Sequence, residues 1–219
     1  MKRRDLLKGM AAISASPILT SYALEGNLVL GKHDALIVVD VQNDFLPGGS
    51  LAVSDGDAVI PVINHCMQLS AAKRLPIYAT RDWHPADHCS FVENGGTWPK
   101  HCIADSPGAQ FAENITFPDD VIIVSKGADS DKEAYSGFQG TDLSDQIHAK
   151  GIRRVIVGGL ATDYCVLNTV YDALANDLDV VLLTHAIRAV DLHPGDGDRA
   201  IKSMMERGAE VHDGLILAD

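Results

Sequence analysis

The stretch RVIVGGLATDYCVLNTVYDALANDL, residues 154–178, joins a predicted strand to a predicted helix around one cysteine. Residues 154–159 form a continuous apolar run, which is typical of a strand buried on both faces. From residue 163 to residue 178 the apolar positions recur with helical spacing. Cys165 therefore stands in the first turn of the predicted helix, where backbone N–H groups and the helix dipole favour a thiolate. A free cysteine is more often a packing residue, so its neighbours decide whether it is a nucleophile.

The rest of the chain alternates between the same two patterns. Apolar runs rich in β-branched residues recur at 35–39, 75–79, 121–124 and 179–183. Segments with helical periodicity lie between or after them, at 57–73, 141–150 and 198–207, and the short run 209–212 predicts an edge strand. We expect one α/β domain, with a doubly wound and mostly parallel central sheet flanked by helices on both faces. The pattern leaves the order of the strands open.

Two charged residues stand where predicted strands end. Asp40 follows the run 35–39, and Lys126 follows the run 121–124. Because the carboxyl ends of parallel strands meet at one edge of a sheet, we expect both side chains to lie near Cys165. A cysteine, a carboxylate and a lysine supply a nucleophile, a base and a charge that tunes the base.

The long connection after the second predicted strand carries candidate metal ligands. Asp82 and His84 are two residues apart directly after that strand, so an extended backbone directs both side chains to the same face. His88 and His101 follow on the same connection. Mixed oxygen and imidazole donors suit zinc, iron or manganese better than calcium or magnesium. The spacing predicts a divalent metal site and leaves open which histidines complete it.

Composition excludes some partners. The 219 residues carry 18 basic and 30 acidic side chains, a formal net charge of −12. A surface for nucleic acid or anionic lipid is not expected at this charge. We also expect no stable membrane anchor, because no stretch reaches the roughly 20 apolar residues of a spanning helix. Assembly into a homo-oligomer stays open.

The first 23 residues read as a signal peptide rather than as part of the domain. A basic start precedes a weakly apolar stretch and the small residues before Ala23. Arg3 and Arg4, followed by DLLK, resemble the twin-arginine export motif. We therefore expect a signal peptide at 1–23, a linker at 24–34, the domain at 35–219 and a periplasmic location. The alternative is a cytoplasmic protein whose first residues form a basic helix.

Several separate motifs carry a family resemblance. ALIVVDVQNDFLPGGSLAV, TRDWHP, WPKHC, SKGA with AYSGF, and GLATDYCV occur in that order between residues 35 and 166. In sequence and spacing they closely resemble the nicotinamidases, also called pyrazinamidases, of the isochorismatase-like cysteine hydrolases. The resemblance implies the isochorismatase-like hydrolase fold and the deamidation of nicotinamide to nicotinate and ammonia.

The resemblance also implies a role for each matching residue. Cys165 is implied as the nucleophile that forms a thioester, with Asp40 as its base and Lys126 as the third member of the triad. One divalent metal ion is implied, zinc before iron or manganese, with Asp82, His84 and His101 as its ligands. The implied donors to the oxyanion are the backbone N–H groups of Ala161 and Cys165.

The implied substrate pocket is aromatic, with Phe45, Trp98, Tyr135 and Tyr164 around a flat ring. Many relatives carry histidine where Tyr164 stands, so the preference among pyridine and pyrazine amides stays open. Two other functions are kept as alternatives. One is an N-carbamoyl or ureidoacrylate amidohydrolase of the same fold, a class that generally lacks the metal set. The other is a metal- or pyridine-binding protein without turnover.

Overall fold

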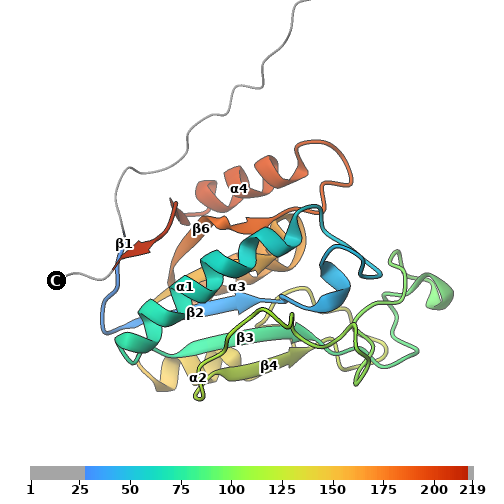
Figure 1. Cartoon of the computed structure of the whole chain (residues 1–219), viewed down its shortest axis with the longest axis horizontal. Coiled ribbons are helices and arrows are strands. Elements are labelled where there is room, and N and C mark those ends of the chain that lie inside the picture. The colour runs from blue at the N-terminus through green and yellow to red at the C-terminus, as the bar shows by residue number, and fades with distance from the viewer. Residues whose placement is uncertain (1–27, 217–219) are drawn as a thin grey trace, which may run out of the picture.

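The computed structural model describes residues 28–216, and the expected signal peptide lies outside this range. At its centre is a parallel six-stranded sheet with the order β4-β3-β2-β5-β6-β7 (Figure 1). Its strands are β2 (Asp34–Val39), β3 (Ile77–Asp82), β4 (Ile122–Lys126), β5 (Arg154–Leu160), β6 (Asp179–Arg188) and β7 (Glu210–His212). The prediction of a doubly wound α/β domain is therefore confirmed.

Helices cover both faces of the sheet, as the continuous apolar strands require. They are α1 (Val59–Ala72), α2 (Leu143–Ala149), α3 (Leu167–Ala175) and α4 (Asp196–Glu206). Alternate residues of β2 enter two separate cores. Leu36 and Val38 pack in the core that contains residues of α1, whereas Ile37 packs in the core that contains residues of α2, α3 and α4.

The strand order places a switch point at the centre of the sheet. The chain runs outward from β2 through β3 to β4, and then returns to β5 on the other side of β2. In open α/β sheets, ligands bind in the crevice beyond the carboxyl ends of the strands at such a point. Asp40 directly follows β2, and Cys165 lies in the turn after β5, so both residues stand at this crevice.

Local structure differs from expectation in two places, at the start of the domain and at the turn that carries Cys165. Residues 28–30 fall within the expected linker, but β1 (Leu28–Val29) pairs in parallel with β8 (Leu215–Ile216), and Leu28 and Leu30 are buried. Burial of these two leucines explains why the segment is part of the fold. The helix expected at 163–178 begins instead with a π-helical turn at Thr162–Val166, which precedes α3.

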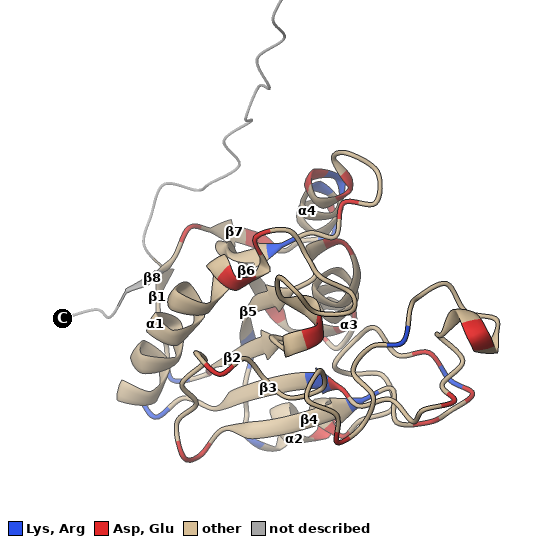
Figure 2. Cartoon of the chain, turned by 45° about the vertical axis from the view of Figure 1, so that its right-hand side comes forward, with Lys and Arg blue, Asp and Glu red and all other residues tan. Residues whose placement is uncertain are grey.

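Charge is distributed unevenly over the loops. Figure 2 shows acidic residues on the loops beyond the sheet and on α4, interspersed with basic residues.

None of the helices within residues 28–216 has the length and apolar character that a membrane span requires.

Candidate active site

A buried lysine stands at the centre of the site. The Nζ atom of Lys126, the last residue of β4, lies 2.9 Å from Oδ2 of Asp40 and 2.5 Å from Oδ1 of Asp82. The same atom lies 3.4 Å from Sγ of Cys165 and donates to the carbonyl oxygen of Ala134 at 3.2 Å. The structure therefore brings together the three residues of the predicted triad, and it adds Asp82 to them.

Asp40 is held by two bonds to the neighbouring strand. Its backbone N–H donates to the carbonyl of Thr80 at 3.1 Å, and the Thr80 hydroxyl donates to Oδ1 of Asp40 at 2.6 Å. The backbone of Asp40 has a φ of 47°, a left-handed conformation that ends β2 and turns the chain at the site. Thr80 was not among the predicted site residues, although its place two residues before Asp82 on β3 was visible in the sequence.

Burial and neighbouring charges shift the pKa values of the triad. Burial raises the pKa of Asp40; Lys126 opposes this shift and Asp82 adds to it. Burial also raises the pKa of the Cys165 thiol, which Lys126 lowers and the two carboxylates raise. Burial opposes the charge on Lys126, but Asp40 and Asp82 hold the pKa of this lysine well above its ordinary value. The expected resting thiolate is therefore not favoured, because two carboxylates face the sulfur beside a single ammonium group.

A second group of donors surrounds the other oxygen of Asp82. Oδ2 of Asp82 lies 3.6 Å from Nε2 of His84 and 4.0 Å from Nε2 of His101, and all three side chains are buried. Their donor atoms lie within 4.8 Å of one another. Ligands about 2.1 Å from a tetrahedral zinc ion are about 3.4 Å apart, so these donors need only a small movement to share one ion.

Backbone carbonyls fix the tautomers of both histidines. Nδ1 of His84 lies 2.8 Å from the carbonyl oxygen of Gly127, and Nδ1 of His101 lies 2.8 Å from that of Pro99. Because a carbonyl oxygen only accepts, each Nδ1 carries a proton, and in the neutral ring each Nε2 has the lone pair that can bind a metal. Gly127 is required at its position, since a Cβ atom there would lie 2.4 Å from the His84 ring.

His88 is held away from this group. Its Nε2 donates to the carbonyl of Lys132 at 3.0 Å, and its Nδ1 accepts from the N–H of Ser90 at 3.2 Å. The ring stacks on His84 with 4.1 Å between centroids. Both nitrogens of His88 are therefore engaged, and the ring supports His84 rather than offering a ligand atom.

The predicted aromatic residues line one pocket beside the cysteine. About 360 Å³ of space, part of it open to solvent, is enclosed by the four predicted aromatic side chains together with Leu51, Asp82, His101, Ala161, Cys165 and Val190. Nε1 of Trp98 donates to the Tyr135 hydroxyl at 2.9 Å, and the rings of Trp98 and Tyr164 meet edge to face at 4.9 Å. The aromatic rings and the small Ala161 side chain give this pocket mostly apolar walls beside Cys165, which suits a planar ring.

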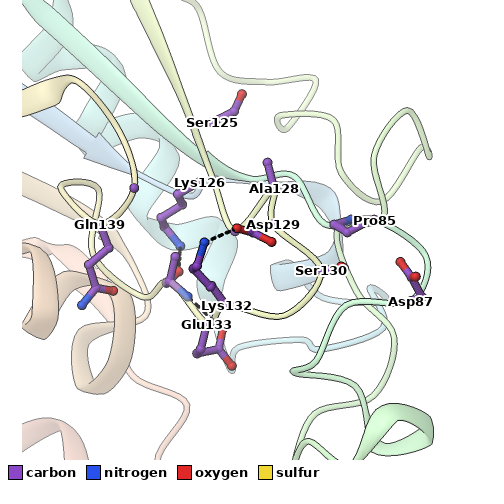
Figure 3. A pocket seen from close by; sticks show the side chains of 13 residues that line it. Pro85, Asp87, Ser125, Lys126, Ala128, Asp129, Ser130, Lys132, Glu133 and Gln139 are labelled. Atoms are coloured by element: carbon purple, nitrogen blue, oxygen red, sulfur yellow. Dashed lines mark hydrogen bonds and ion pairs between the residues drawn. The ribbon is translucent and has the colours of Figure 1, made fainter.

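A larger and more polar cavity lies on another side of Lys126. The loop 127–140 lines most of it, and Figure 3 shows Lys132 directed toward Asp129, with which it forms an ion pair. Of the predicted catalytic, pocket and metal residues, only Lys126 lines this cavity. It therefore lacks the nucleophile and the aromatic walls, and the small apolar pocket is the candidate site for chemistry.

Two consecutive glycines beside the site have a structural role. Gly158 and Gly159 lie within β5, and a Cβ atom on Gly159 would stand 2.0 Å from the Val39 carbonyl oxygen of β2. With a φ of 133°, Gly159 lets β5 approach β2 where the two strands reach the site.

The comparisons with known proteins agree with this geometry. Residues 34–214 match the family model described as the isochorismatase domain. The chain is 35% identical to the nicotinamidase of Escherichia coli, over 81% of this chain and 93% of that protein. It is also similar to a crystal structure of the pyrazinamidase of Pyrococcus horikoshii in complex with zinc, with 46% identity, a TM-score of 0.79 and coverage of 82% and 98%. A structure from L. infantum in complex with nicotinate has 34% identity and a TM-score of 0.78, and covers 88% of this chain and 100% of that one.

Proposed function

Because the chain belongs to the isochorismatase family, we propose that it is a nicotinamidase, a cysteine amidohydrolase that converts nicotinamide to nicotinate and ammonia and also accepts pyrazinamide. The observation that carries this function is the arrangement around Lys126, which bonds to Asp40 and contacts Cys165 while it also bonds to Asp82 of the metal-ligand group. Hydrolysis of the amide and placement of the substrate ring can therefore occur in one small pocket.

The first half-reaction forms a thioester. Asp40 takes the proton of the Cys165 thiol, and the sulfur attacks the amide carbon. A base is most effective when its pKa approaches the working pH, so the raised pKa of Asp40 favours this transfer. The C–N bond then breaks, and ammonia leaves with the proton that Asp40 carried. Lys126 stabilises the ionised carboxylate and holds it near the sulfur.

The second half-reaction releases the acid. Asp40 takes a proton from water, and the resulting hydroxide attacks the thioester carbon. The carbon–sulfur bond then breaks, and Asp40 returns the proton to the sulfur of Cys165. We assign the backbone N–H groups of Ala161 and Cys165, both at the pocket wall, to the oxyanion of each tetrahedral intermediate. The four aromatic side chains of the pocket, Phe45, Trp98, Tyr135 and Tyr164, pack around the substrate ring.

The three donors fit a divalent metal ion, because their ligand atoms are buried and lie within 4.8 Å of one another. Two imidazole nitrogens and one carboxylate oxygen suit zinc, and iron and manganese are the other candidates. An ion held by Asp82, His84 and His101 would bind the ring nitrogen of the substrate, directly or through water, and so orient the amide toward Cys165. The zinc complex of the similar pyrazinamidase supports zinc as the first choice.

The metal-ligand group also separates this function from the alternatives. An N-carbamoyl or ureidoacrylate amidohydrolase would use the triad but would not need Asp82, His84 and His101 together. A binding protein without turnover would not need the triad. The test is ammonia release from nicotinamide by purified protein, with and without a chelator. No release, or release that is unchanged after chelation, would contradict a metal-dependent nicotinamidase.

We also propose that the protein is exported to the periplasm by a twin-arginine signal at residues 1–23. Arg3, Arg4 and the small residues before Ala23 support this proposal. The twin-arginine route carries folded proteins, so the buried thiol and the metal ligands can be assembled before export. Cleavage near Ala23 would leave β1 intact, since that strand begins at Leu28.

A further inference from the structure

The side chain of Gln42 bridges the two halves of the site. Gln42 follows Asp40 by two residues, and its side chain is completely buried. Its Oε1 accepts from the N–H of Asp82 at 2.8 Å, and its Nε2 donates to the carbonyl of Asp82 at 2.8 Å and to that of Ala109 at 2.9 Å. Because the N–H of Asp82 only donates and the two carbonyls only accept, the orientation of this amide is unambiguous.

The hydrogen bonds of the Gln42 side chain take the place of backbone pairing between β2 and β3, which ends before Asp82. Parallel pairing between β2 and β3 runs as far as Val39 and Thr80. The left-handed conformation of Asp40 then turns the chain, so the backbone of β2 no longer reaches Asp82. The amide of Gln42 presents one acceptor and one donor to Asp82, as a neighbouring peptide group would in a sheet.

The position of Asp82 matters more than that of an ordinary strand residue. One oxygen of its carboxylate bonds to Lys126, and the other faces His84 and His101. A rotation of the Asp82 backbone would therefore move one metal donor and one partner of the lysine at the same time. With its backbone held at both N–H and C=O, this carboxylate is placed between the two groups before any ligand binds.

We propose that Gln42 is a positioning residue whose side-chain amide holds Asp82 in the geometry that binds the metal and orients Lys126. The inference rests on the proposed metal site. Removal of hydrogen-bond partners behind metal ligands typically lowers metal affinity about 10- to 100-fold. Gln42→Met keeps the approximate volume and removes all three bonds. Gln42→Glu keeps an acceptor for the N–H of Asp82 but sets an oxygen against the two carbonyls.

A matched control is available on α1. Asn64 also bonds to backbone on both sides, donating to the carbonyl of Asn114 and accepting from the N–H of Thr116, each at 2.9 Å. Its side-chain amide bridges two backbone groups outside the site. Asn64→Leu therefore reports the general effect of losing an amide that bonds to the backbone in this way.

The experiment is competition for Zn²⁺ between each purified protein and a chromophoric chelator, followed by kcat and KM on nicotinamide. We expect Gln42→Met and Gln42→Glu to bind Zn²⁺ at least about 10-fold more weakly than wild type, and Asn64→Leu to bind it as wild type does. If Gln42→Met does not fold, Gln42→Glu decides the question. Wild-type affinity in a folded Gln42 variant would overturn the role of Gln42 alone. Wild-type protein that takes up no Zn²⁺ would overturn the metal site itself.

Discussion

The Nζ atom of Lys126 lies 2.5 Å from Oδ1 of Asp82, so one hydrogen bond joins the predicted catalytic triad to the predicted metal ligands. The other oxygen of Asp82 faces two histidines, and burial of its charge is offset by Lys126 and His84, which hold the pKa of Asp82 below its ordinary range. Changes to the lysine, the carboxylate or the metal should therefore affect one another.

Replacement of Cys165 by alanine tests the covalent mechanism. Because Cys165 is the one cysteine of the described residues that lines the pocket, we expect Cys165→Ala to lose at least about a thousandfold in kcat while it still binds metal. Steady-state ammonia release measures the loss. Cys89→Ala is the control, since Cys89 is a free thiol that does not line the pocket. Substantial turnover by Cys165→Ala would rule out the thioester.

Replacement of Lys126 by methionine tests the central cation. Two buried carboxylates would lose their shared partner, so we expect stability to fall by about 3–5 kcal/mol and turnover to be lost. Urea unfolding measures the change in stability. Lys132→Met is the control, because its ion pair with Asp129 is exposed and its loss should leave stability nearly unchanged. Equal stability of the two variants would show that Lys126 does not stabilise the two buried carboxylates.

Replacement of Thr80 by valine tests the base. Activity requires ionised Asp40, whose pKa is raised by burial, so kcat/KM should decline as the pH falls through that raised pKa. The Thr80 hydroxyl bonds to the ionised form, so its loss should raise the pKa further and move the acid limb to higher pH by on the order of one unit. Thr116→Val, at an exposed threonine, should leave the limb in place. A limb that moves to lower pH would mean that another group is the base.

Removal of the metal and of single histidines tests the ligand set. Chelation should abolish turnover of nicotinamide and pyrazinamide, and benzamide, which has no ring nitrogen, should be a poor substrate of the metal-loaded protein. His101→Ala should weaken Zn²⁺ binding more than His88→Ala does, because both nitrogens of His88 already bond within the protein. Equal rates on benzamide and nicotinamide would show that the ring nitrogen does not position the substrate. Weaker Zn²⁺ binding by His88→Ala than by His101→Ala would mean that His88, not His101, is the ligand.

Replacement of the arginine pair tests export. We expect wild-type protein outside the inner membrane, shortened near Ala23, and we expect Arg3→Lys with Arg4→Lys to retain an active, unprocessed form inside the cell. Fractionation and mass spectrometry of the amino terminus measure both outcomes. Full-length wild-type protein in the cytoplasm would end the export proposal and leave the enzyme assignment unaffected.

Local sequence was sufficient for the strands of the central sheet and for the four helices. Apolar runs and helical spacing predict β2 to β7 and the four helices, because burial on both faces leaves a continuous pattern in a strand and a periodic one in a helix. Asp40, Asp82 and Lys126 were visible as polar residues at the ends of such runs. The π-helical turn that carries Cys165 was not predicted, because its backbone depends on the packing of the segment between β5 and α3.

Strand order and side-chain partners required the tertiary structure. Parallel strands pair through backbone groups that carry no sequence information, so only the folded chain decides that β2 lies between β3 and β5. That order makes Asp40 and Cys165 neighbours. The same reason applies to Gln42, which is two residues from Asp40 in sequence but bonds to a residue forty positions away. The sequence by itself determined which chemical groups the protein carries, and the packing of distant segments determined which of them meet.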